Sequence, residues 1–138
     1  MNISRFREIT LNLLRVVAAF LFMCHGAQKL FAVLGRQHAA ALGTMMGTAG
    51  VLEFYGGALI LIGLFTRPVA FILCGEMAYA YWMSHFPRGF WPIQSGGELA
   101  ALYCFLFLFF CANGGGDFSI DGWRRKRARK AAEETARV

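Results

Sequence analysis

Four long blocks of apolar residues, each almost free of charged side chains, constrain this sequence more than any other feature. A bilayer core of about 30 Å needs about 20 helical residues to cross it. Three blocks are long enough, and the fourth is long enough if its helix takes in the glutamate at its start. The sequence therefore predicts four transmembrane helices, at about residues 9–31, 47–65, 68–86 and 96–113.

The composition also indicates contact with lipid. Of the 138 residues, 57% are hydrophobic and 16% are charged, and a small soluble domain leaves too much of its surface in water to hide that much apolar area. No segment alternates like a barrel strand, whereas helices satisfy their backbone groups internally. We predict an all-α, integral membrane four-helix bundle. The first block lacks the cleavage site of a signal peptide, so we expect it to stay as an anchor.

Lysine and arginine residues predict the orientation. An even number of spans places both termini on one side, and that side holds most of the cations, including Arg7, Arg67 and six within residues 124–130. Because cytoplasmic segments carry this excess, we predict that the N and C termini are cytoplasmic. Residues 1–121 would form the membrane domain. Residues 122–138 would form a basic tail that contacts anionic lipid headgroups, and nucleic acid is not an expected partner because no folded reader domain accompanies the tail.

Ionisable residues within the apolar blocks fall at a common depth. On the predicted topology they lie near the outer ends of their helices: His25, Lys29, Glu53 and Glu98, with His85 at the margin. His25 and Lys29 are four residues apart and therefore share one helix face. Ionisable groups inside a span cost at least a few kcal/mol, so they normally face the bundle interior and pair. We expect these residues to form one polar cluster.

The predicted cluster has a functional interpretation and a structural one. As a site, it would hold a quinone headgroup or a small anion. Four residues would be catalytic. Lys29 would bind negative charge, and the other three would exchange protons near neutral pH: His25, Glu53 and Glu98. Trp91 would line the lip of the pocket, or belong to an aromatic belt at the membrane boundary. As a structural feature, the cluster would be an ion-pair network that fixes helix packing.

Two further charged residues receive predictions of their own. Glu76 lies near mid-membrane, where it would act as a proton relay or form a hydrogen bond to a neighbouring helix. Arg67 lies in the turn between the second and third spans, just before a proline that suits the first turn of a helix. We predict that Arg67 forms an ion pair with Asp117 or Asp121 and locks the inner face.

The four cysteines are interpreted as small buried hydrophobic residues: Cys24, Cys74, Cys104 and Cys111. No two form a C-x-x-C pair, and the predicted spans place them at different depths, which argues against a disulfide framework or an iron–sulfur site. Cys24 is the exception worth testing, because it adjoins a histidine near the outer side. No histidine or glutamate spacing typical of a metal site is present, so no metal is predicted.

A set of short motifs resembles one known family. In chain order they read His25-Gly26-x-x-Lys29, Glu53-x-x-Gly56-Gly57, Leu61-x-Gly63-Leu64-x-Thr66-Arg67, Gly97-Glu98, Gly114-x-Gly116 and Ser119-x-Asp121. In this order and at this spacing they resemble the DoxX family of small four-helix bacterial membrane proteins. The likeness runs from about Arg15 to Asp121, nearly the whole chain outside the basic tail.

The resemblance implies a multi-pass protein of the bacterial inner membrane and a role in redox chemistry. Some members are the membrane subunit of a thiosulfate:quinone oxidoreductase, and others are partners in thiol or oxidative-stress assemblies. The implied cofactor is a quinone, not covalently bound, in contact with His25, Lys29, Glu98 and Trp91. The chain lacks the second domain fused to some relatives, so we expect an oxidoreductase subunit that needs a protein redox partner or a homo-oligomer.

Two alternatives to the redox role stay open. One is a non-catalytic membrane adaptor or assembly factor, in which the polar cluster is purely structural. The other is a small-solute or proton carrier, which would require an oligomer because four short helices leave little room for alternating access.

Overall fold

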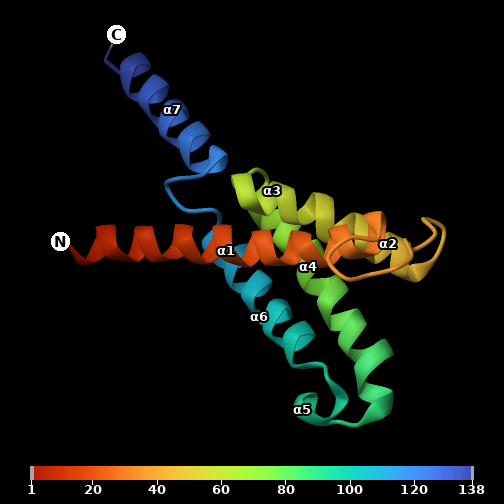
Figure 1. Cartoon of the computed structure of the whole chain (residues 1–138). Helices are drawn as coiled ribbons and strands as arrows, with labels where there is room; N and C mark the ends of the chain where they lie inside the picture. Colours follow the sequence, from red (N-terminus) through yellow and green to blue (C-terminus); the bar gives the residue numbers. More distant parts are fainter. Residues whose placement is uncertain (1, 138) are drawn as a thin grey trace.

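The computed structural model describes residues 2–137, and every regular element in this part of the chain is a helix (Figure 1). The elements are α1 (Ile3–Phe31), α2 (Met45–Val51), η1 (Leu52–Gly56), α3 (Gly57–Ile62), α4 (Thr66–Ala80), η2 (Tyr81–His85), η3 (Phe86–Arg88), α5 (Pro92–Ser95), α6 (Glu98–Asn113) and α7 (Ile120–Thr135). η1 and η2 are π-helical turns, and η3 is a 3-10 turn. The prediction of an all-α chain is confirmed.

Two helical hairpins form the body of the fold. α1 packs along the continuous helix made by α2, η1 and α3, and α4 packs along α6. Figure 1 shows the two hairpins meeting near the middle of α1 and diverging toward their connecting loops. We call the end with residues 32–44 and α5 the outer end. The inner end holds the N-terminus, the turn at residues 63–65 and the start of α7.

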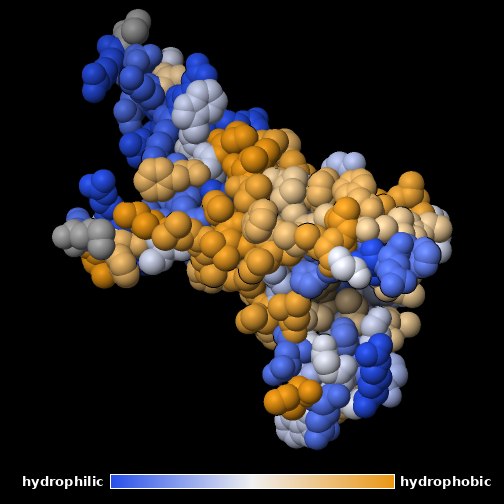
Figure 2. Space-filling model, in the orientation of Figure 1, coloured by the Kyte–Doolittle hydropathy of each residue, from blue (hydrophilic) through white to orange (hydrophobic). Residues whose placement is uncertain are grey.

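Two helices are long and apolar enough to cross a membrane: Ile3–Phe31 and Met45–Ile62. α6 is apolar but shorter, with 16 residues. Large apolar side chains face outward along the helices; Phe71 is 68% exposed and Phe105 is 70% exposed. Figure 2 shows apolar surface over the middle of the molecule, with polar surface gathered on α7 and around α5. Crossing by all four predicted spans, and cytoplasmic termini, stay predictions.

Aromatic side chains join the two hairpins where they meet. Phe22 on α1 packs against Tyr103 and Phe107 on α6, with ring centroids 4.9 and 4.7 Å apart. Phe22 and Phe107 are fully buried. In lipid, helices associate through close packing because burial of apolar surface alone adds little there. This contact therefore sets where α6 crosses α1.

Glycines bring α1 close to the second helix. A Cβ at Gly26 would overlap the backbone of Phe54 in η1, and one at Gly57 would lie 2.7 Å from Met23. Small residues of this kind let helix backbones approach within a membrane. The approach places Lys29, one turn beyond Gly26, directly beside Glu53.

Arg15 ties the inner end of the fold together. Its side chain is buried, at 2% exposure, and each of its five N–H groups has an acceptor. The acceptors are the carbonyl oxygens of Gly115 (2.9 Å), Ile60 (2.7 Å), Leu61 and Phe118 (3.0 Å), and Oδ1 of Asn12 (3.2 Å). A guanidinium is the side chain that offers five donors in a rigid fork. Arg15 thus caps α3 and fixes the loop after α6; its place inside an apolar block was the sequence signal for such a role.

The predicted ion pair of Arg67 with Asp117 or Asp121 is wrong. Asp121 instead accepts hydrogen bonds from the backbone N–H groups of Phe65 (3.0 Å) and Thr66 (2.8 Å), which open α4. Asp117 pairs with Arg125 and Lys126 on α7, at 3.1 and 3.0 Å. The free N–H groups at the start of α4 compete for a carboxylate as a cation would. Backbone N–H groups, not the Arg67 side chain, are therefore the partners of Asp121 at the inner turn.

Candidate functional site

A cavity of about 210 Å³ opens at the outer end, where the two hairpins diverge. Helices from both hairpins line it: Phe22, His25 and Lys29 of α1, Glu53 of η1, Met77 and Ala80 of α4, His85 of η2, Gly96, and Leu99, Ala100 and Tyr103 of α6. Of the four predicted catalytic residues, the structure therefore brings together His25, Lys29 and Glu53. Their common depth follows from the antiparallel threading that the apolar blocks predicted.

Lys29 and Glu53 form an ion pair across α1 and η1. The Glu53 side chain is 5% exposed and the Lys29 side chain is 21% exposed. Lys29 Nζ donates to Glu53 Oε1, whereas Oε2 is buried without a hydrogen-bond donor among residues 2–137. Buried carboxylate oxygens normally have partners, because an unpaired one costs its full desolvation free energy. Oε2 of Glu53 is therefore an unpaired hydrogen-bond acceptor on a residue of the cavity wall.

Two histidines stand on different helices of the cavity. His25 lies on α1, one turn before Lys29, with its ring edge-on to Tyr103 at a centroid distance of 6.5 Å. His85 lies on η2, and its Nδ1 is 3.2 Å from the carbonyl oxygen of Ser95. A carbonyl only accepts, so Nδ1 of His85 carries the proton in this contact. In the neutral ring, Nε2 of His85 is then free to accept.

Both π-helical turns contribute a cavity residue. Glu53 lies in η1 and His85 lies in η2. A π-helical turn inserts an extra residue into the helix, shifts the side chains that follow it, and is frequent at functional sites. Sequence periodicity assumes a regular α-helix, so neither turn was predicted from the sequence.

Two predicted site residues lie outside this cavity. Glu98 is the first residue of α6, is exposed, and does not line the cavity. Trp91 is 61% exposed and packs edge-on against Phe90 at 5.3 Å. Ala100 of α6 lines the cavity, and at 100° per residue Glu98 lies about 200° around the helix from it. The predicted membership of Glu98 and Trp91 is corrected on geometry, and His85 belongs to the cluster instead.

A second, larger cavity of about 420 Å³ lies between the second helix and α4. It is lined by Met45, Thr48, Ala49, Leu52, Ile72, Gly75, Glu76 and Tyr79. Both carboxyl oxygens of Glu76 are buried and lack a hydrogen-bond donor among the described residues. The predicted hydrogen bond from Glu76 to a neighbouring helix is therefore absent from the described structure, and Glu76 borders an otherwise apolar cavity.

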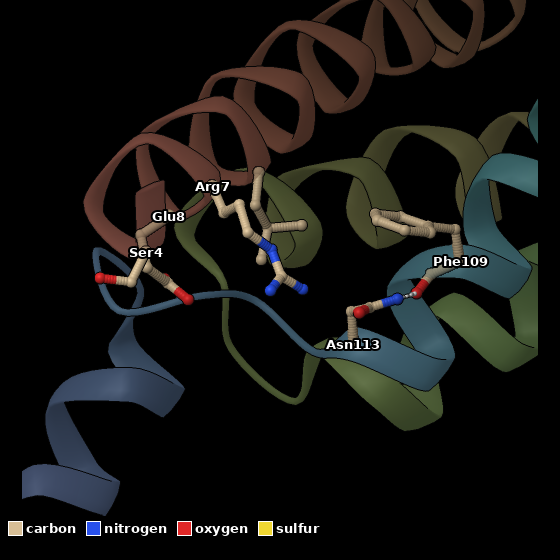
Figure 3. A pocket seen from close by; sticks show the side chains of 6 residues that line it. Ser4, Arg7, Glu8, Phe109 and Asn113 are labelled. Carbon is tan, nitrogen blue, oxygen red and sulfur yellow. Dashed lines mark hydrogen bonds between the residues drawn. The ribbon is translucent and has the colours of Figure 1, made fainter. Parts of the chain in front are cut away.

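A third cavity, of about 330 Å³, lies at the inner end (Figure 3). Figure 3 shows the guanidinium of Arg7 reaching into it, with Ser4, Glu8 and Asn113 around the rim. Asn113 Nδ2 donates to the carbonyl oxygen of Phe109 at 2.9 Å. The lining carries one cation, Arg7, and one carboxylate, Glu8, so the cavity has no excess of either charge.

The expectation that the cysteines lie at different depths is wrong for one pair. Cys74 on α4 and Cys104 on α6 have their Sγ atoms 3.7 Å apart. All four cysteines are free thiols. Across residues 2–137, no group of three His, Cys, Asp or Glu side chains is placed to hold a metal ion.

Comparison with known proteins tests the family resemblance that the motifs suggested. The sequence model of the DoxX family matches residues 10–86, a segment that includes His25, Lys29, Glu53 and His85. An uncharacterized protein of Haemophilus influenzae is 44% identical over 126 residues, covering 87% of this chain and 94% of the relative. No solved structure matches. The resemblance drawn from the motifs is thereby confirmed: this chain belongs to the DoxX family.

Proposed function

We propose that the outer cavity binds the ring of a quinone, and that the chain is a quinone-linked membrane subunit or partner of a sulfur or thiol redox system. The observation that carries this proposal is Glu53 Oε2, a buried acceptor without a donor among residues 2–137, on a residue that lines the cavity. A ligand hydroxyl would supply the missing donor. Buried polar groups without partners are costly unless a ligand satisfies them.

The charges of the site favour a neutral ligand over the small anion. Lys29 and Glu53 are already paired, so their charges cancel within the cavity wall. The open acceptor belongs to a carboxylate, which would repel an anion and attract a hydroxyl group. A quinol offers two hydroxyls and a quinone offers two carbonyl oxygens, and both forms are uncharged.

The polar groups of the cavity suit the proton chemistry of such a ligand. When bound, a quinone accepts two electrons and two protons. Lys29 Nζ has further N–H groups to donate to a carbonyl oxygen, and Glu53 Oε2 can accept from a hydroxyl. His25 and His85 belong to the residue type that exchanges protons near neutral pH. The residues present therefore can bind both redox states and can carry protons to and from them.

The size and walls of the cavity fit a single ring with access from lipid. Its volume of about 210 Å³ is below the roughly 300–1,000 Å³ of pockets for drug-sized ligands. The remaining walls are apolar, from Phe22, Met77 and Ala80. Leu99 also lines the cavity and is 46% exposed, so this wall of the cavity belongs to an apolar residue that also reaches the outer surface of α6. A lipid-soluble ligand would approach there while its tail stays in the bilayer.

The proposed setting is the bacterial inner membrane, with both termini in the cytoplasm. The cations of α7, together with Arg7 at the inner cavity, would contact anionic lipid headgroups. Electrons would come from a protein redox partner or from a substrate, since the sequence has no flavin, haem or cluster motif. The chain would thus act as one component of an oxidoreductase, not as a complete enzyme.

A thermal-shift measurement tests the site. Purified protein in detergent is heated with and without a short-chain quinone or quinol analogue, and the melting temperature Tm is compared. We expect a concentration-dependent rise in Tm for the wild type and for the Glu98→Gln variant, whose side chain lies outside the cavity. Glu53→Ala, which removes the open acceptor, should abolish the rise. A rise that persists in a folded Glu53→Ala protein, or none in the wild type, contradicts the proposal.

The structural alternative, a membrane adaptor, rests on the same ion pair. Lys29 and Glu53 join α1 to η1 and would fix their register. The His25→Gln and His85→Gln variants separate the two proposals because neither breaks this ion pair. Loss of the analogue-induced rise in Tm at unchanged basal Tm supports the quinone site. No analogue-induced rise in Tm in the wild type or in either variant supports the adaptor.

A further inference from the structure

We propose that Cys74 and Cys104 are a redox-active dithiol, which a quinone in the outer cavity oxidises to a disulfide between α4 and α6. The two Sγ atoms lie 3.7 Å apart although the residues are 30 positions apart in the chain. This inference rests on the proposed function of the outer cavity for the identity of the oxidant. The juxtaposition of the thiols does not depend on it.

The distance between the two Sγ atoms is only slightly longer than a disulfide bond requires. A disulfide has an S–S distance of about 2.05 Å, so the two sulfur atoms would need to move closer by about 1.7 Å. Rotation of the two cysteine side chains is the movement that would close this gap. α4 and α6 pack against each other along their lengths, which holds both residues in place.

The dithiol lies close to the outer cavity on both of its helices. Met77 lines the cavity and is three residues after Cys74; Ala100 lines it and is four residues before Cys104. Residues at these spacings are neighbours on one helix face, about one turn or 5.4 Å apart along the axis. Tyr103, next to Cys104 in sequence, also lines the cavity. The thiols therefore lie about one helical turn from the cavity wall.

The oxidation balances without any other reactant. The two S–H bonds break, one S–S bond forms, and the thiols lose two electrons and two protons. The quinone takes up both electrons and both protons and leaves as the quinol. Glu53 and the two histidines of the cavity are the groups placed to pass the protons.

The disulfide would link α4 covalently to α6, and each of these helices forms one wall of the cavity. α4 contributes Met77 and Ala80 to the cavity, and α6 contributes Leu99, Ala100 and Tyr103. A covalent link one turn deeper would limit how far these two helices can separate. Cys24 and Cys111 have no sulfur contact of this kind within residues 2–137, and they serve as internal controls.

The experiment uses the full chain, purified in reductant and transferred to oxygen-free detergent buffer. One sample receives diamide, a general thiol oxidant, and another receives a short-chain quinone analogue. Free thiols are then counted by alkylation and intact mass, and the linked peptides are mapped after proteolysis. We expect the wild type, Cys24→Ala and Cys111→Ala to lose two thiols under both oxidants, with a peptide of α4 joined to one of α6. Cys74→Ala and Cys104→Ala should form no intramolecular link.

The outcomes separate this proposal from that of the quinone site. If diamide fails to join Cys74 to Cys104, the dithiol is overturned whatever the thermal-shift result. If diamide joins them and the quinone analogue does not, the quinone is overturned as their oxidant. If the analogue oxidises the wild type and a folded Glu53→Ala variant at equal rates, the dithiol stands and the outer cavity is overturned as the site of oxidation. A rate at least tenfold lower in Glu53→Ala is the expected result.

Discussion

The inner and outer ends of this molecule differ in how completely the hydrogen-bonding groups of a buried charged side chain are paired. At the inner end, all five N–H groups of Arg15 reach an acceptor, four of which are backbone carbonyl oxygens. At the outer end, Glu53 has one oxygen paired with Lys29 and one without a donor. Both side chains are almost fully buried.

The contrast distinguishes a fully paired structural group from a group that, on the proposed function, a ligand would pair. A fully satisfied polar network stabilises one arrangement of helices, whereas a partly satisfied one is less stable than it would be with every group paired. The four buried side-chain atoms without a partner among residues 2–137 include three carboxyl oxygens, from Glu53 and Glu76, and each of these residues lines a cavity. The fourth is the Thr66 hydroxyl at the inner end. Four predictions test this contrast, in order of decreasing effect.

The first prediction breaks the inner end. Arg15→Leu would remove five donors; the carbonyl oxygen of Ile60 keeps the N–H of Gly63 (3.0 Å), and each acceptor left buried and unpaired costs about 1–3 kcal/mol. We expect a loss of at least about 3 kcal/mol of unfolding free energy, seen as little monodisperse protein in size-exclusion chromatography and a much lower Tm. Arg67→Leu is the control because Arg67 is exposed and makes no ion pair in the described structure. Equal stability of the two variants would refute the structural role of Arg15.

The second prediction separates α1 from η1. In Gly26→Ala the new Cβ would overlap the backbone of Phe54, and overpacking of this kind costs about 1–3 kcal/mol. Gly75→Ala is the matched control, since a Cβ there has no atom within 4 Å; replacing a helical glycine by alanine should raise stability by about 0.5–1 kcal/mol. The two changes in Tm should therefore have opposite signs. A rise in both would show that the close approach is not required.

The third prediction concerns Glu53 alone. Glu53→Gln keeps the size of the side chain and an acceptor for Lys29, whose side chain is 21% exposed, but it weakens the ion pair to a hydrogen bond with a neutral amide, so stability should fall by about 1.5 kcal/mol. The affinity for the quinol analogue should fall about tenfold, equivalent to about 1.4 kcal/mol, because an amide replaces the carboxylate acceptor. Titration of the analogue against intrinsic tryptophan fluorescence measures the affinity. Tight binding retained by Glu53→Gln would remove the distinction between the two ends.

The fourth prediction concerns the inner surface. A hydrogen bond from Lys126, and further charge from Arg125, lower the pKa of Asp117 below its ordinary value of 3.8. The depressed pKa stabilises the folded state above that ordinary value, and the contribution disappears as the pH falls through the lower, folded-state pKa. Since these side chains are largely exposed, the effect should be a few tenths of a kcal/mol.

Thermal unfolding at a series of pH values from about 5 downward measures the contribution of Asp117. Asp117→Asn should flatten this part of the profile, and added salt should weaken the effect in the wild type because salt screens exposed charges. An unchanged profile in Asp117→Asn would show that α7 is held at the inner surface by other contacts.

The sequence alone determined the helical class, the family and the shared depth of His25, Lys29 and Glu53. Apolar blocks report helix lengths, because a hydrocarbon core demands about 20 apolar residues per helix. The four-residue spacing of His25 and Lys29 reports a common face. These features are local, so they can be predicted without knowing how the helices are arranged.

Only the tertiary structure decided which residues meet. The rotation of α6 about its axis excludes Glu98 from the cavity, whereas Glu53 and His85, which lie in the π-helical turns, line it. The crossing of α4 and α6 brings Cys74 and Cys104 together. Asp121 accepts hydrogen bonds from free backbone N–H groups and does not pair with Arg67. Rotation and crossing depend on close contacts between distant segments, and hydrophobic periodicity along a single helix carries no information about them.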